Sequence, residues 1–233
     1  MTTVNATSGT PVRSSPLEAV HARLHARWRA PGLRWPIDYG DPAAEAEAAR
    51  SSAGLIDWGP LNKLIVQGSG AAAALGSLSI QFVPGKVTSE TSGGVSLHVW
   101  GVAPDEAIVL AGHGAALPAL TAQRVSAVDL SSALTALRLV GPNARNILAE
   151  LCPDDLGPDA VHDLRVVHAP VANVRVTLAR QDMAAIPGFT LLVPRDYAAY
   201  MWESLMHTGA HHGLVSLGNH LLDTRVEFGE TPS

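Results

Sequence analysis

The feature of this sequence that most constrains its fold is a series of short strand-like runs that lacks a regular helical partner after each run. Apolar and β-branched residues form runs typical of strands, which lie at Leu55–Trp58, Lys63–Val66, Val95–Trp100, Ala107–Ala111, Ala136–Val140, Val171–Leu178 and Phe189–Val193. Helical spacing falls between only some of them, at Ala71–Leu75, Ala115–Gln123, Ala144–Leu151 and Tyr197–His207. A parallel βαβ sheet needs a helix after nearly every strand, so the pattern predicts an α+β fold with largely antiparallel sheets and flanking helices.

Two further helices are predicted near the start of the chain. Ser15-Pro16-Leu17-Glu18 combines an N-cap serine, a proline in the first turn and a glutamate at the capping-box position. Asp41-Pro42 begins the second helix, which runs through an alanine-rich stretch to Arg50, and Gly54 is placed to end it.

Length and composition bound the organisation of the chain. Its 233 residues are 47% hydrophobic and 16% charged, which excludes disorder over most of the length. We expect a disordered tail over residues 1–14, a folded region over 15–229 and a short tail over 230–233. The net charge of −5 gives no electrostatic attraction to nucleic acid or to an anionic membrane, so we expect neither as a partner.

The single cysteine, Cys152, excludes an intrachain disulfide framework and a zinc site built from several thiolates. No apolar run approaches the roughly 18 residues that a membrane-spanning helix needs. Residues 1–16 have no hydrophobic stretch like that of a signal peptide. These observations predict a cytoplasmic protein.

Ten histidines invite a search for a metal site. His21 and His25 lie four residues apart, as in metal-binding helices, but Ala22 stands where the HExxH pattern has its glutamate, so a solvated helix face is favoured. His211 and His212 lie beside glycine turns, where exposed histidines are common. No metal site is therefore expected.

Residues 68–73 read Gly-Ser-Gly-Ala-Ala-Ala and match the GxGxxA form of the dinucleotide fingerprint. The helix that follows is interrupted early by Gly76, and about 20 residues further on Glu90 lies in a turn-rich stretch rather than at a strand end. A plain strand-turn-helix is the favoured interpretation.

Several segments, in order, resemble the glycine-cleavage T-protein (aminomethyltransferase) superfamily. Ala53-Gly54-Leu55-Ile56-Asp57 is similar to the family's A-G-[LM]-F-D, and residues 139–144 are close to its L-x-G-P-N-A. Gly85-Lys86 and Gly93-Gly94 resemble its glycine turns, and residues 223–229 follow its closing pattern. The resemblance spans roughly residues 17–229.

This resemblance implies two interlocked α+β subdomains around a channel for tetrahydrofolate, and transfer of a one-carbon unit, methyl or aminomethyl, from an amine, ether or sulfide to that cofactor. His98 and Asp57 are expected near the chemistry, and the expected cofactor contacts are Trp58, His113, Arg225 and Glu227. Full-length members continue into a C-terminal barrel, which we expect to be missing here. The protein would then act on a small molecule as a homo-oligomer or with a partner subunit.

Three positions depart from the family's pattern. The aspartate expected soon after the double glycine is absent, with His98 the nearest titratable replacement, and Ala111 begins the stretch that carries an asparagine in the family. Ile186 and Thr190 stand where the family carries glutamates, one of which grips the pterin ring. The alternative is a folate-independent use of the scaffold, as a non-catalytic subunit of a complex or as an enzyme acting on another small molecule.

Overall fold

The computed structural model describes residues 15–28, 35–92, 95–112, 115, 117–120, 122–183 and 186–219. Structural statements below refer to these residues. The two tails expected at residues 1–14 and 230–233 lie outside them, as do Gly93-Gly94, His113, Arg225 and Glu227.

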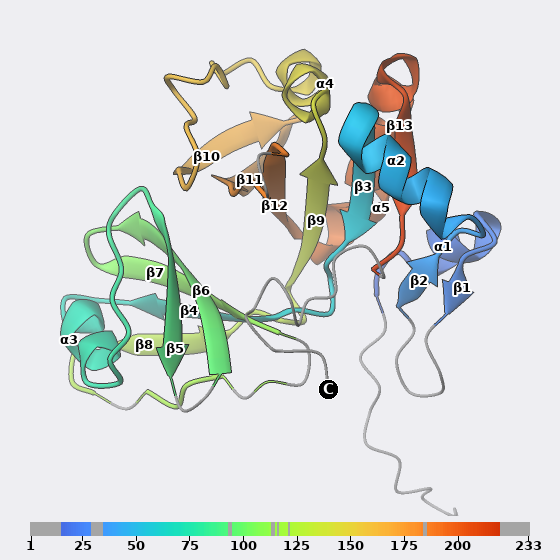
Figure 1. Cartoon of the computed structure of the whole chain (residues 1–233). Coiled ribbons are helices and arrows are strands. Elements are labelled where there is room, and N and C mark those ends of the chain that lie inside the picture. Colours follow the sequence, from blue (N-terminus) through green and yellow to red (C-terminus); the bar gives the residue numbers. More distant parts are fainter. Residues whose placement is uncertain are drawn as a thin grey trace, which may run out of the picture.

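Two β-sheets form the framework of the molecule (Figure 1). The larger sheet has the strand order β10-β11-β12-β9-β3-β13, with bounds β3 (Ala53–Asp57), β9 (Leu134–Val140), β10 (Val166–Val171), β11 (Val174–Arg180), β12 (Gly188–Pro194) and β13 (Leu214–Leu217). The smaller sheet has the order β5-β6-β7-β4-β8, with bounds β4 (Asn62–Gln67), β5 (Val87–Ser92), β6 (Val95–Ala103), β7 (Glu106–Ala111) and β8 (Ser126–Asp129). A short ribbon pairs β1 (Arg27–Trp28) with β2 (Pro36–Asp38).

The smaller sheet is an insertion between two neighbouring strands of the larger one. The chain leaves the larger sheet after β3, builds β4 to β8, and returns as β9, which pairs with β3. The pairings in the two main sheets are antiparallel except for β13, which runs parallel to β3 and closes that edge. This arrangement confirms the predicted α+β class with largely antiparallel sheets.

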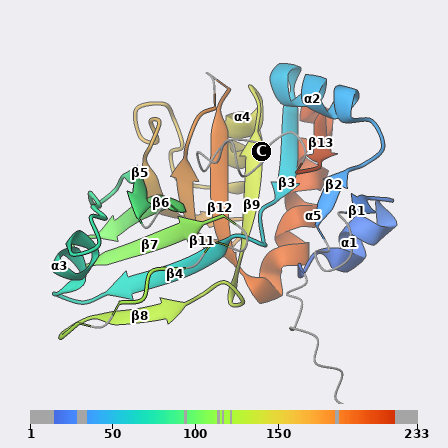
Figure 2. The same ribbon diagram turned by 60° about the horizontal axis from the view of Figure 1, so that its bottom comes forward.

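Helices flank both faces of the larger sheet and one face of the smaller sheet. α1 (Glu18–Arg23), α4 (Ala144–Leu151) and α5 (Ala198–Gly209) pack on one face of the larger sheet, and α2 (Pro42–Ser51) packs on its other face. α3 (Ala71–Gly76) lies on the smaller sheet (Figures 1 and 2). Two 3-10 turns, η1 (Arg195–Tyr197) and η2 (Ala210–His212), flank α5. None of the helices in the described part of the chain is long and apolar enough to cross a bilayer.

Strand alternation divides the core into three layers. Leu55, Leu137 and Leu191 face α1, α4 and α5, whereas Ile56, Ala136 and Leu192 face the smaller sheet. The second set meets Trp100 and Ile108 of the smaller sheet and forms what we call the inter-sheet layer. The third layer packs the outer face of the smaller sheet against α3.

Several local predictions are corrected by the structure. The described residues of the Ala115–Gln123 stretch contain no helix. The run Val171–Leu178 is broken by a hairpin turn, because Ala172 and Asn173 adopt positive φ angles of 47° and 62°. The expected start of the first helix and the expected end of the second also differ. α1 begins after Leu17 without a side-chain cap, and Gly54 lies inside β3 rather than ending α2.

Two other local predictions are confirmed. The Asp41 carboxylate accepts hydrogen bonds from the backbone N–H groups of Ala43 and Ala44, so it caps α2 as expected. Residues 62–76 form a strand, a turn and a helix of six residues. That helix is too short to support the dinucleotide interpretation, in agreement with the favoured reading.

Candidate functional site

Arg138 is the largest charged side chain buried between the two sheets. It lies in β9, where the flanking Leu137 and Leu139 face the helices, so alternation directs Arg138 into the inter-sheet layer. Its Nη1 donates to Thr190 Oγ1 at 3.0 Å and its Nη2 donates to the Gln181 carbonyl at 2.6 Å. The side chain is therefore fixed by β12 and by the residue that follows β11.

Trp58 follows β3 and packs against this guanidinium. The Arg138 Cζ atom lies 4.9 Å from the centre of the Trp58 ring, within the range of a cation–π contact. Trp58 is 4% exposed, and its indole N–H has no hydrogen-bond partner among the described residues. A buried donor of this kind can be satisfied by an acceptor atom of a ligand.

His98 enters the same layer from the smaller sheet. It is 8% exposed, and Gln181 Nε2 donates to its Nδ1 at 2.7 Å. Since Nδ1 accepts this hydrogen bond, the neutral ring carries its proton on Nε2. The pair joins β6 to the end of β11, so the hydrogen bond also links the two sheets.

Lys63, one of the chain's two lysines, is fully buried at the start of β4. Its Nζ donates to the carbonyls of Gly59 and Leu61, both at 2.8 Å. The inter-sheet layer thus contains two cationic side chains and a histidine.

Asp57 lies next to Trp58 in sequence but belongs to the opposite face of the larger sheet. It pairs with Leu137, so its carboxylate points toward α1. Asp57 Oδ1 accepts from Gly59 N–H at 2.7 Å, and Oδ2 accepts from the hydroxyl of Ser15. The strand therefore separates Asp57 from the face that carries Trp58 and His98.

His21 completes the surroundings of Asp57. Its Nε2 lies 3.0 Å from Asp57 Oδ2, and its Nδ1 lies 2.8 Å from the Tyr39 hydroxyl. Burial, followed by the negative charge of Asp57, raises the pKa of Tyr39. The side chain of His21 is fully buried, so the predicted solvated face holds for His25 but is wrong for His21.

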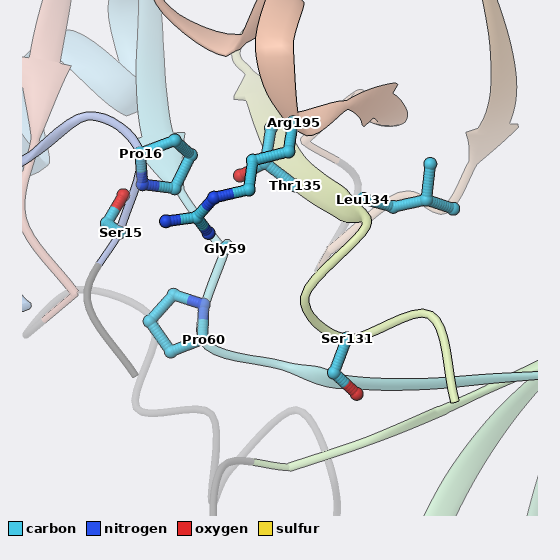
Figure 3. Close-up of a pocket in the computed structure, with 8 residues that line it drawn as sticks. All are labelled: Ser15, Pro16, Gly59, Pro60, Ser131, Leu134, Thr135 and Arg195. Carbon is cyan, nitrogen blue, oxygen red and sulfur yellow. The ribbon is translucent and has the colours of Figure 1, made fainter. Parts of the chain in front are cut away.

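A narrow crevice opens beside this cluster. Figure 3 shows Arg195 reaching between Pro16 and Pro60 toward Ser15. The free volume of about 10 Å³ is enough for one water molecule. A ligand the size of a pterin therefore does not fit in this crevice.

Asp57 and the buried cations lie on opposite faces of the larger sheet. The other buried carboxylates among the described residues are Asp38, which pairs with Arg27, and Glu45 of α2, which accepts from Gly218 N–H. Lys63 and Arg138 lie in the inter-sheet layer. The described polar groups of that layer are thus mainly hydrogen-bond donors, which suit a ligand with carboxylate or carbonyl oxygens.

The structure brings together two of the six expected site residues, Trp58 and His98, which both face the inter-sheet layer. It places Asp57 on the other face, and His113, Arg225 and Glu227 lie outside the described residues. Arg138 and Lys63 were not among the residues expected at the site. A signal for Arg138 was present, because it is a lone charge in the otherwise apolar run Ala136–Val140.

Comparison with known proteins supports one family. The model of the GCVT N-terminal domain matches residues 17–229. The aminomethyltransferase of Saccharopolyspora erythraea is 31% identical over 236 residues, covering 93% of this chain and 64% of the relative. That of Streptomyces coelicolor is 30% identical and is also covered over 64% of its length, against 95% of this chain. The chain therefore spans about 64% of the length of these curated relatives.

Two solved structures share the fold. The glycine cleavage system aminomethyltransferase T from Bartonella henselae has a TM-score of 0.76 at 19% identity, covering 95% of this chain and 64% of that one. A chain of the heterotetrameric sarcosine oxidase from Corynebacterium sp. U-96 has a TM-score of 0.65 at 22% identity. That match covers 89% of this chain and 100% of the oxidase chain. With the family model matched over nearly the whole chain, the protein belongs to the GCVT N-terminal domain family.

Proposed function

We propose that this chain forms the folate-binding part of a tetrahydrofolate-dependent one-carbon transferase that moves a methyl or aminomethyl group. The observation that carries the proposal is the family match over residues 17–229, with relatives described as aminomethyltransferases. The protein would act in the cytoplasm on a small molecule.

The inter-sheet layer supplies the groups that would bind such a ligand. Trp58 N–H, Gln181 and Arg138 would meet its carbonyl or carboxylate oxygens, and His98 would donate a hydrogen bond from Nε2 to the heteroatom of the donor. Asp57 would act indirectly, by fixing the end of β3 that positions Trp58. We further propose that His113, Arg225 and Glu227 line the pocket, with Arg225 near the glutamate tail of the folate.

Titration of the full chain with tetrahydrofolate tests this function. We expect saturable binding by calorimetry, with one ligand per chain. Trp58→Phe keeps an aromatic ring but removes the indole donor, so it should weaken binding about 2- to 10-fold. The matched control is Trp202→Phe, which changes a buried tryptophan on the helix-covered face and should leave affinity unchanged. Lack of any tetrahydrofolate binding, alone and in its native assembly, would rule the proposal out.

A second function, a folate-independent subunit or enzyme on the same scaffold, has its own support. Thr190 stands at one of the two positions where the family carries a glutamate, and its hydroxyl accepts a hydrogen bond from Arg138. The buried carboxylate of Asp57 lies on the other face of the larger sheet, so it does not pair with the N–H donors of a pterin bound beside Trp58 and His98. The full-length match to one chain of a heterotetrameric oxidase is consistent with a role beside other subunits.

Thr190→Glu distinguishes the two functions. If the scaffold has abandoned folate, the native chain does not bind tetrahydrofolate, and the added carboxylate beside Arg138 restores measurable binding. If the native chain already binds, the folate-independent function is excluded. Sedimentation velocity on the purified chain would show whether it self-associates, as expected for a homo-oligomer, or stays monomeric until a partner is added.

A further inference from the structure

Glu150, His211 and His212 form a cluster on the helix-covered side of the larger sheet, away from the inter-sheet layer. Glu150 lies in the last turn of α4, and the histidines lie in η2 directly after α5. Glu150 Oε1 is 3.1 Å from His211 Nε2 and 2.7 Å from His212 Nε2. One donor atom from each side chain can be chosen so that all three lie within 4.8 Å of one another.

The backbone beneath the cluster is held in place. The carbonyl of His212 accepts hydrogen bonds from Ser52 Oγ at 2.6 Å and from Asn143 Nδ2 at 3.0 Å. Asn143 is the N-cap residue of α4, and Glu150 lies seven residues, or two helical turns, further on, so both project from the side of α4 that meets His212. Gly213 then turns the chain with a φ of +71°, and a Cβ there would lie 2.4 Å from Ser52 Oγ. The histidines are therefore presented from a fixed turn.

The spacing of the three atoms suits a transition-metal ion. Zinc binds imidazole nitrogen and carboxylate oxygen at about 2.0–2.2 Å, which places ligand atoms about 3.3 Å apart in a tetrahedron. The observed separations of 3.1 and 2.7 Å from Glu150 Oε1 are about 0.2 and about 0.6 Å shorter than this tetrahedral spacing, and all three donor atoms lie within 4.8 Å of one another. Small side-chain rotations would let an ion replace the shared hydrogens. The exposed fractions of 62% for His211 and 46% for Glu150 leave a path for its entry.

We propose that Glu150, His211 and His212 form a binding site for one Zn²⁺ ion, with water at the fourth position. Two imidazoles and one carboxylate make up a ligand set that zinc uses in sites with an open position. Because Glu150 comes from α4 and the histidines follow α5, the bound ion would tie these two helices together. The proposal is independent of the function assigned to the inter-sheet layer.

Calorimetric titration of the untagged full chain with Zn²⁺ is the direct test. We expect one equivalent to bind with micromolar or tighter affinity and to raise the midpoint of thermal unfolding. His211→Ala and Glu150→Gln should each weaken Zn²⁺ binding at least tenfold. A double variant that combines His211→Ala with His212→Ala should lose both Zn²⁺ binding and the thermal shift. The matched control is His168→Ala on β10, an exposed histidine outside the cluster, which should behave like the native chain.

Cobalt gives an independent readout of the coordination. Co²⁺ bound by these three side chains and water should show the strong visible absorption of a four-coordinate site, and this absorption should vanish in the double variant. Failure of the native chain to bind Zn²⁺, or undiminished binding by the double variant with its circular dichroism unchanged, would show that the cluster is only a hydrogen-bonded surface contact.

Discussion

Asp57 is held by three groups from three segments of the chain. Ser15, His21 and Gly59 all donate or lie in hydrogen-bonding distance to its carboxylate, and the side chains of Asp57 and His21 are fully buried. Removing one partner of a buried carboxylate lowers the stability of the fold, because the remaining charge is then buried without compensation. At the residue scale, Asp57 is thus expected to matter first for anchoring α1 to the larger sheet.

Removal of the His21 imidazole tests this view. His21→Ala leaves the buried Asp57 charge without its imidazole partner and should lower the free energy of unfolding by about 3–5 kcal/mol. The control is Glu203→Ala, which breaks an ion pair with Arg23 whose side chains are 68% and 60% exposed, and should cost at most about 1 kcal/mol. Urea denaturation followed by circular dichroism measures both. Equal losses in the two variants would contradict the account.

At the scale of elements, β13 depends on a close approach of backbone to backbone. It pairs with β3, and the chain then passes β2 so closely that a Cβ on Gly218 would lie 2.0 Å from the Ile37 carbonyl oxygen. The Gly218 N–H donates to the Glu45 carboxylate at 2.8 Å, which ties the same point to α2. Glycine is required here by space.

Gly218→Ala should therefore destabilise the fold by at least about 1–3 kcal/mol, because the added methyl group must push a backbone carbonyl aside. Gly76→Ala is the matched control, since a Cβ at this exposed end of α3 meets nothing within 4 Å. That variant should be neutral or slightly stabilising, as alanine favours helices over glycine. Thermal unfolding of both proteins decides the point, and a destabilised Gly76→Ala would argue against the explanation.

Much of this element structure could be predicted from the sequence, and the failures have physical causes. Runs such as Ala107–Ala111 and Phe189–Val193 became buried strands because both their faces pack against apolar neighbours. Val171–Leu178 was wrongly predicted as one strand, because its apolar residues continue through a turn in which Asn173 has a positive φ. β8 was missed since its residues are largely exposed and carry no continuous apolar pattern.

The candidate site was less predictable than the fold. His98 and Trp58 lay in segments that resemble the family, so they could be singled out. Asp57 could not be assigned to a face from the sequence. Which residues of β3 point to which face of the sheet becomes known only when the register of β3 with β9 is fixed. The contact between Arg138 and Thr190 joins positions 52 residues apart, and no local pattern reports such a pairing.

At the scale of the whole molecule, the inter-sheet layer makes the two sheets depend on each other. Trp100, 1% exposed, packs there with residues of the larger sheet such as Ile56 and Leu192. The insertion of the smaller sheet between β3 and β9 adds a covalent link at both of its ends. The two sheets should therefore unfold as one cooperative unit.

Trp100→Ala tests this dependence. It should lower the free energy of unfolding by about 3–5 kcal/mol while keeping a single transition that coincides for fluorescence and far-UV circular dichroism. Val128→Ala, at a 46% exposed position of β8, should change stability little. Two separate transitions in the native protein would show that the sheets are independent units.

The parallel pairing of β13 with β3 also has a consequence for synthesis on the ribosome. β3 emerges early, whereas the strand that covers its outer edge is made last among the described elements. During translation the backbone groups of this buried, apolar strand would remain open to pairing with other nascent chains. A chaperone that shields the growing chain until β13 has emerged would therefore raise the yield of this protein more than it changes the stability of the finished fold.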